Sequence, residues 1–78
     1  MEPKVLFAKY FPNYKMQSIF ERVAESWMCS AACLAPDGEI LAEADGRLCT
    51  SKRDTESWAI VKLLAQLDGG IFDREFIY

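Results

Sequence analysis

Three cysteines are the residues of this 78-residue chain with the most obvious capacity for chemistry. Cys29 and Cys33 are four residues apart, so they share one face of either a strand or a helix, and Cys49 could join them from a neighbouring strand. Three thiolates with a carboxylate as fourth ligand would suit zinc. Zinc-binding pairs normally lie in turns, however, whereas this C-x₃-C spacing lies among Ala and Ser in a predicted strand. We therefore predict that the cysteines are small buried hydrophobic residues, and we expect no metal or other cofactor.

Nucleophilic catalysis would need a base beside the thiol or hydroxyl, and the chain contains no histidine. Carboxylate pairs remain at Glu39 and Glu43 and at Glu21 and Glu25, but exposed pairs at this spacing are typical of solvated surfaces. A glycine-rich phosphate loop is also missing, since Gly69–Gly70 follows a helical pattern instead of preceding one. The sequence therefore predicts a protein that is not an enzyme.

The charges are scattered, with nine basic and twelve acidic residues and a net charge of −3. Nucleic-acid binders usually cluster a basic surplus on one face, so we expect no direct nucleic-acid partner. The N-terminal segment lacks the basic start of a signal peptide, and no apolar run approaches the roughly 18 residues of a membrane span. We expect no membrane association, a cytoplasmic location, and reduced cysteines.

Residues 1–78 should form a single domain. The aromatic segment Lys4–Phe11, between two prolines, predicts a strand, and the apolar spacing from about Tyr14 to Ser26 predicts a helix. Pro36-Asp37-Gly38 predicts a turn that joins strands Met28–Ala35 and Glu39–Ala44.

The second half of the chain contains a clearer helical signal. Ser51 with Asp54 three residues later resembles a capping box, and the apolar stripe that follows predicts a helix at Asp54–Asp68. Before it, Arg47–Thr50 predicts a third short strand or a bent continuation of the second. After it, the apolar tail Ile71–Tyr78 should add an edge strand or pack under a helix.

The predicted fold class is therefore α+β, in the order β-α-β-β-α with a possible final β. The alternation of apolar and polar residues along Glu39–Ala44 favours a sheet with one wet face. We predict a single antiparallel-rich sheet with both helices on one face, as in a ferredoxin-like fold. The alternative is a helix–sheet–helix sandwich.

The segment Asp54-Thr55-x-x-x-Ala59-Ile60, continued by Leu64 and Leu67, resembles the closing helix of small phage proteins called ABA-sandwich domains. This resemblance, which extends from the hairpin to Gly69, implies a small phage-type protein without a catalytic constellation. Proteins of this kind often act sterically on a host protein complex, and anti-CRISPR proteins are the best-known group. The resemblance therefore implies an inhibitory binding protein, a candidate anti-CRISPR protein acting on a CRISPR-Cas effector.

The alternative function is a small regulatory ligand-binding or dimerisation module of βαββαβ type, and the chain could be a monomer or a homodimer. For the binding protein we expect partner contact through the wet sheet face and the loops around it. Exposed tyrosines beside mixed charges are typical of protein-binding patches. The predicted partner-binding residues are Tyr10, Tyr14, Glu39, Glu43, Asp45, Lys52 and Arg53.

Overall fold

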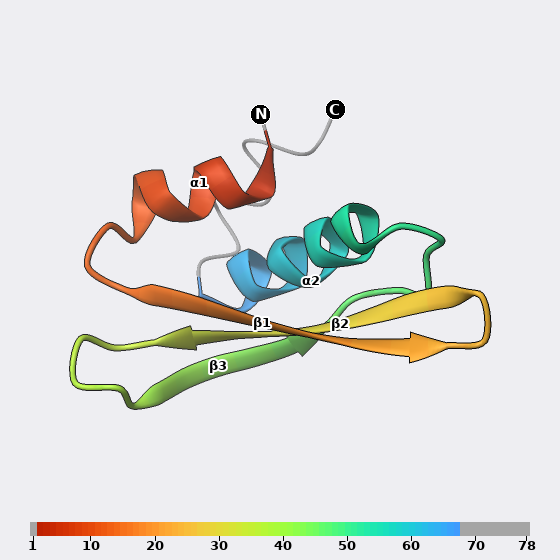
Figure 1. The fold of residues 1–78 in the computed structure, drawn as a ribbon. Helices are drawn as coiled ribbons and strands as arrows, with labels where there is room; N and C mark the ends of the chain where they lie inside the picture. The colour runs from red at the N-terminus through yellow and green to blue at the C-terminus, as the bar shows by residue number, and fades with distance from the viewer. Residues whose placement is uncertain (1, 68–78) are drawn as a thin grey trace.

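The computed structural model describes residues 2–67, which form a helix, three strands and a second helix (Figure 1). In chain order these are α1 (Pro3–Tyr10), β1 (Lys15–Val23), β2 (Ser26–Leu34), β3 (Ile40–Asp45) and α2 (Lys52–Leu67). The strands form one antiparallel sheet in the order β1-β2-β3, and both helices lie on the same face of it. The α+β class with two helices on one face is confirmed. The predicted ferredoxin-like order is wrong, because a helix precedes the strands, and the sandwich alternative is also wrong.

The segment predicted as a strand at Lys4–Phe11 is the helix α1. Pro3 stands in its first turn, where a missing N–H needs no helical partner. Leu6 and Phe7 are buried in the core and Tyr10 packs against it, which is the spacing of one helical face. The sequence signal was misleading because apolar residues also occupy other faces of this helix: Val5 is exposed.

The segment predicted as a helix from Tyr14 to Ser26 is the strand β1 and its turn into β2. Val23 pairs with Ser26, so the hairpin closes with only two residues, and the first of them, Ala24, has a φ of 55°. Met16 and Phe20 pack against the core from the helix-covered face, whereas Ile19 lies on the opposite face.

The predicted hairpin around Pro36-Asp37-Gly38 is confirmed as β2 and β3. Asp37 Oδ1 accepts a hydrogen bond from the Glu39 amide at 2.9 Å, and Gly38 adopts a φ of 94°. The expected short strand at residues 47–50 is reduced to one bridge between Trp27 and Cys49. The tail predicted at residues 71–78 lies outside the described residues.

The core lies between the helices and the covered face of the sheet. Fully or almost fully buried residues come from both helices and the central strand: Leu6 and Phe7 of α1, Cys29, Ala31 and Cys33 of β2, and Ala59, Ile60, Leu63 and Leu64 of α2. The interpretation of the cysteines as small buried hydrophobic residues is thus confirmed for Cys29 and Cys33, whereas Cys49 is only partly buried.

One buried polar residue, Thr55, joins α2 to the central strand. Its hydroxyl oxygen accepts a hydrogen bond from the Cys29 amide at 2.9 Å, and the Cys29 carbonyl accepts one from the Gly46 amide at 2.8 Å. A Cβ atom on Gly46 would lie 2.2 Å from the carbonyl oxygen of Thr55. Only glycine therefore fits where the chain passes from β3 to α2.

Candidate protein-binding face

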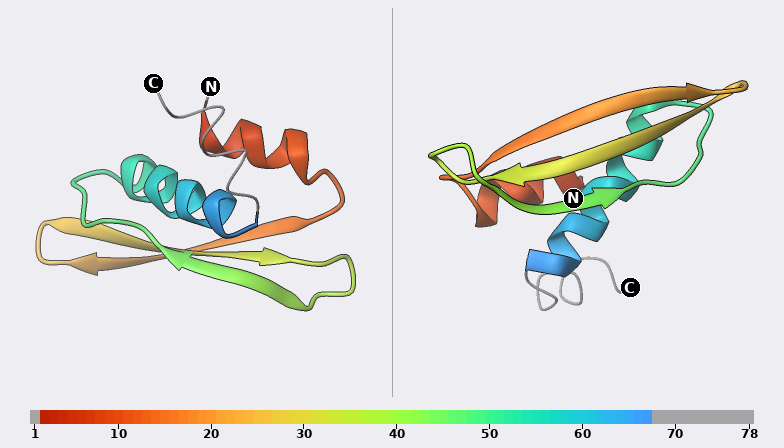
Figure 2. Two further views of the ribbon diagram at one scale, coloured as in Figure 1. Left: turned by 180° about the vertical axis from the view of Figure 1, so that it is seen from behind. Right: turned by 90° about the horizontal axis from the view of Figure 1, so that it is seen from below.

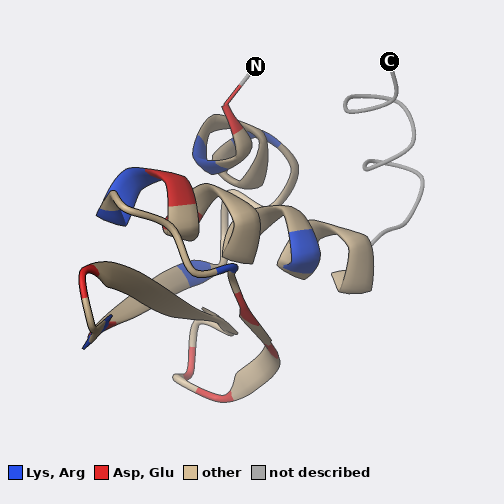
Figure 3. Cartoon of the chain, turned by 90° about the vertical axis from the view of Figure 1, so that its right-hand side faces the viewer, with Lys and Arg blue, Asp and Glu red and all other residues tan. Residues whose placement is uncertain are grey.

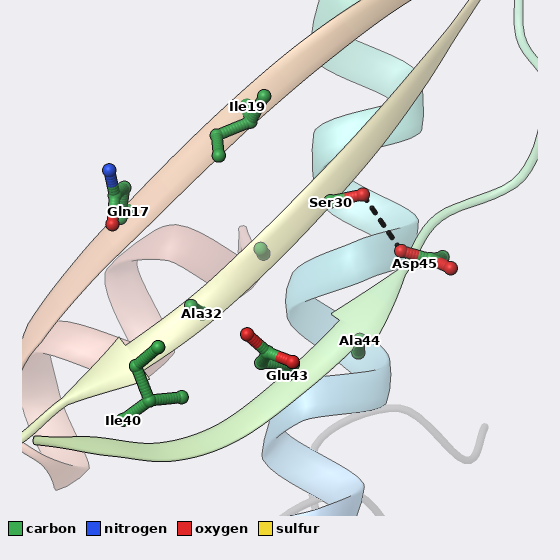
Figure 4. Close-up of a pocket in the computed structure, with 9 residues that line it drawn as sticks. Gln17, Ile19, Ser30, Ala32, Ile40, Glu43, Ala44 and Asp45 are labelled. Carbon is green, nitrogen blue, oxygen red and sulfur yellow. Dashed lines mark hydrogen bonds between the residues drawn. The ribbon is translucent and has the colours of Figure 1, made fainter.

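The two helices leave one face of the sheet without a covering element among the described residues (Figure 2). We call this surface the open face. It is lined by the outward side chains of all three strands, shown in Figure 4: Gln17, Ile19, Ser30, Ala32, Ile40, Glu43 and Asp45.

A trough runs along the open face because the central strand carries small side chains. Ser30 and Ala32 of β2 lie between the larger Ile19 on β1 and Ile40 on β3 (Figure 4). The trough has a volume of about 320 Å³. Ile40 reaches this face through an irregularity in the pairing of β2 with β3, where it lies opposite Leu34.

The flanks of the trough are apolar and exposed. Ile19 is 61% exposed and Ile40 is 54% exposed. Single exposed apolar side chains are common on soluble proteins, but these two flank the same trough, on either side of Ala32. Ile19 lies opposite Ser30 and Ile40 lies opposite Leu34, so a partner surface that spans the trough would be needed to remove both side chains from water.

The β3 side of the trough is acidic. Glu43 and Asp45 alternate with core residues along β3, so both carboxylates lie on the open face. Asp45 Oδ1 accepts a hydrogen bond from the Ser30 hydroxyl at 2.8 Å, which fixes its orientation. Figure 3 shows acidic positions along β3 and the turn before it, away from the basic start of α2.

The structure brings only part of the predicted partner-binding set together. Glu43 and Asp45 line the open face side by side, and Glu39 lies in the turn that leads into the same strand. Tyr14 precedes β1, where its ring stacks on Phe11 with 5.8 Å between the centroids.

The remaining predicted residues lie in the two helices, which cover the opposite face of the sheet. Tyr10 belongs to α1, and the Lys9 ammonium lies 5.1 Å from its ring centroid. At the start of α2, the Lys52 ammonium lies 4.5 Å from the Trp27 ring centroid, and Arg53 forms an ion pair with Glu2. These residues do not line the trough.

Cys29 and Cys33 have no reactive environment in the described structure. Cys29 and Cys33 are fully buried, and burial raises the pKa of both thiols above the usual value of 9.0. A raised pKa keeps the thiol protonated, which is the unreactive form. Within residues 2–67, no group of three cysteine, histidine or acidic side chains is placed to hold a metal ion. Neither described helix has the length and apolarity needed to cross a bilayer.

The two isoleucines of the open face are not among the predicted partner-binding residues. Ile19 lies in the segment that the apolar spacing predicts as a helix, and Ile40 lies in the predicted strand Glu39–Ala44. Comparison of the chain with protein-family models, curated proteins and solved structures finds no match. The geometry of the open face is therefore the ground on which a function can be proposed.

Proposed function

We propose that this chain is a non-enzymatic binding protein that captures a partner protein on its open face. The observation that carries the proposal is the apolar trough between Ile19 and Ile40 on a sheet face that no described element covers. The side chains that form it are held by strand pairing, so the surface exists before a partner arrives. Preorganisation of this kind lowers the entropy lost on binding.

The chemistry of the trough selects the kind of partner. Its apolar flanks at Ile19 and Ile40 suit exposed aliphatic or aromatic side chains, and its acidic border at Glu43 and Asp45 suits flanking lysine or arginine residues. The same carboxylates would repel the phosphates of a nucleic acid. A basic and apolar protein surface is therefore the partner that the open face fits best.

The resemblance of the closing helix to phage proteins supplies a candidate for that partner. A host complex such as a CRISPR-Cas effector, in the cytoplasm of a bacterial cell, can be blocked by a protein that only occupies its surface. Inhibition of this steric type requires no catalytic residue. The candidate identity as an anti-CRISPR protein is thus compatible with a chain that acts through a binding surface such as the open face.

The experiment is quantitative capture with two variants matched in exposure. Ile40 on the open face and Leu48 in the loop before α2 are each 54% exposed, so Ile40→Glu and Leu48→Glu introduce the same charge at equally accessible positions. The tagged proteins are incubated with lysate containing CRISPR effector complexes, captured proteins are quantified by mass spectrometry, and the captured subunit is then titrated in purified form.

We expect Ile40→Glu to weaken binding of the purified subunit at least about tenfold, because it places a charge in a desolvated contact. Leu48→Glu should bind like the wild type. Equal binding by both variants would show that the open face is not the contact surface. Capture of a different, identified protein with the same variant pattern would retain the binding face and reject the CRISPR effector as its partner.

A further inference from the structure

Within the described residues, the outer edge of β1 is long and has no strand paired with it. In the part of the chain that the structure describes, β1 pairs only with β2, and in the view from below it forms the border of the sheet (Figure 2, right). It runs for nine residues without proline and without an irregularity in its pairing. The other edge strand, β3, has only six residues, and its pairing with β2 is irregular near its start. The carbonyl oxygen of Glu43 in β3 also accepts a hydrogen bond from Gln66 Nε2 at 2.9 Å. Soluble proteins commonly blunt exposed edges, so β1 stands out as a pairing surface.

The direction of the β1 backbone groups follows from the strand beside it. Trp27 exchanges two backbone hydrogen bonds with Cys49, and the N–H and C=O of Cys29 are likewise engaged on the side away from β1. Their partners across the ladder, Arg22 and Phe20, are therefore not hydrogen-bonded to them. The N–H and C=O groups of these two β1 residues lie in the plane of the sheet and point away from β2.

By alternation, Met16 and Ser18 also expose their backbone groups along this edge. An antiparallel partner strand would pair with Met16, Ser18 and Phe20, and the odd-numbered residues would form the closer, non-hydrogen-bonded pairs. The side chains of such pairs interact most strongly across strands.

The side chains of β1 are complementary to β1 of a second copy. With Ser18 on a two-fold axis, Lys15 of one copy lies opposite Glu21 of the other, and Met16 lies opposite Phe20. Each pairing occurs twice, once on either side of the axis. The ion pairs fall at the close positions, and the apolar pairs fall on the face that already packs toward the core.

Neighbouring registers lack this match. With the axis at Ile19, Lys15 would lie opposite Val23, and Met16 would lie opposite Arg22. With the axis at Phe20, Ser18 would lie opposite Arg22 and Lys15 would lie beyond the end of the paired strand. The strand is therefore self-complementary in one register.

We propose that two copies of this chain form a homodimer by antiparallel pairing of their β1 strands with Ser18 on the two-fold axis. The dimer has a continuous sheet of six strands, three from each copy, with all helices on one side and both open faces on the other. The inference goes beyond the proposed function and does not depend on it, because it concerns an edge of the sheet instead of its face.

The test is sedimentation equilibrium of the untagged full chain and of three charge variants. Lys15→Glu and Glu21→Lys each replace two attractive pairs in the dimer by two repulsive ones, and the double variant Lys15→Glu/Glu21→Lys restores attraction with the signs exchanged. The two residues lie far apart along one strand, so the rescue reports contact between copies.

We expect the 8.9 kDa wild-type chain and the double variant to dimerise with similar dissociation constants. Each single variant should dimerise about tenfold more weakly. A wild-type chain that stays monomeric at millimolar concentration would overturn the proposal, as would single variants that dimerise like the wild type or a double variant that fails to recover. The capture experiment with Ile40→Glu leaves β1 unchanged, so failure of one proposal is distinguishable from failure of the other.

Discussion

The hydroxyl oxygen of Thr55 joins α2 to the central strand β2 through one buried hydrogen bond. Its hydroxyl satisfies the buried amide of Cys29, and Thr55→Val removes that acceptor while keeping the shape of the side chain. We expect the free energy of unfolding to fall by about 1–3 kcal/mol, the cost of an unsatisfied buried donor. Urea denaturation measures this, with Thr55→Ser as the control that keeps the hydroxyl. A valine variant at least as stable as the serine variant would contradict the role given to this hydrogen bond.

The buried thiols predict an alkaline limit to stability. Burial raises the pKa of Cys29 and Cys33 in the folded state, so the folded protein holds their protons more tightly than the unfolded chain. Their contribution to stability is fully present below the unfolded pKa near 9.0 and is lost as pH rises through the folded values. The free energy of unfolding should therefore fall with pH above about 9, and it should fall less steeply in Cys33→Ala. Identical slopes for the two proteins, measured by urea denaturation at several pH values, would refute this.

The hairpin that joins β1 to β2 contains a strained residue. Ala24 has a φ of 55°, a conformation that costs alanine about 1–2 kcal/mol and that asparagine tolerates better. Ala24→Asn should therefore raise the free energy of unfolding by about 0.5–1 kcal/mol. Thermal and urea denaturation measure the change, and Glu25→Asn at the adjacent turn position is the matched control. An equal gain in both variants would mean that the backbone conformation of Ala24 is not the cause.

The presence or absence of turn and cap residues explains which elements could be predicted from the sequence. Pro36-Asp37-Gly38 and the cap at Ser51, whose hydroxyl accepts a hydrogen bond from the Asp54 amide at 3.1 Å, mark the boundaries of their elements, so β2, β3 and α2 are predicted close to their observed positions. Ala24-Glu25 contains no glycine, proline or asparagine, so nothing in the sequence indicates a turn there.

Without that boundary, hydrophobic spacing alone could not separate helix from strand in the first half. Met16 and Phe20 are four residues apart, a spacing that places two side chains on one face in either structure. The residues of the open face could likewise be predicted only in part. Glu43 and Asp45 belong to β3, which matches the strand predicted at Glu39–Ala44 to within a residue at each end, whereas Ile19 lies in a segment predicted as a helix and was not predicted to line the open face.

Hydrogen exchange can measure the pairing of β1 at each backbone amide. In the proposed dimer, the amides of Met16, Ser18 and Phe20 are hydrogen-bonded across the axis, and those of Gln17 and Ile19 bond to β2. We expect slow exchange at all five positions in the wild type at dimer-forming concentration. In Glu21→Lys, exchange should become fast at the three even-numbered positions only. Fast exchange at these positions in the concentrated wild type would contradict edge pairing.

At the scale of the whole molecule, the fold separates stability from the proposed binding function. The helices and the covered face of the sheet bury the core, whereas the open face carries apolar side chains that contribute little to folding because they remain in water. Edge pairing through β1 would align two such faces without using either of them. A partner with two basic and apolar contact points would then bind with an avidity that one chain lacks.

This separation predicts that the open face can be altered without loss of stability. Ile19→Thr/Ile40→Thr keeps β-branched side chains on both strands, so the free energy of unfolding should change by less than about 1 kcal/mol, although partner binding is lost. Leu63→Ala, a truncation of similar chemistry in the fully buried core, should cost about 2–5 kcal/mol. Urea denaturation and binding are measured on the same preparations. If the double variant were destabilised as much as Leu63→Ala, the two isoleucines would be part of the folding core, and the open face would be a covered surface in the native protein.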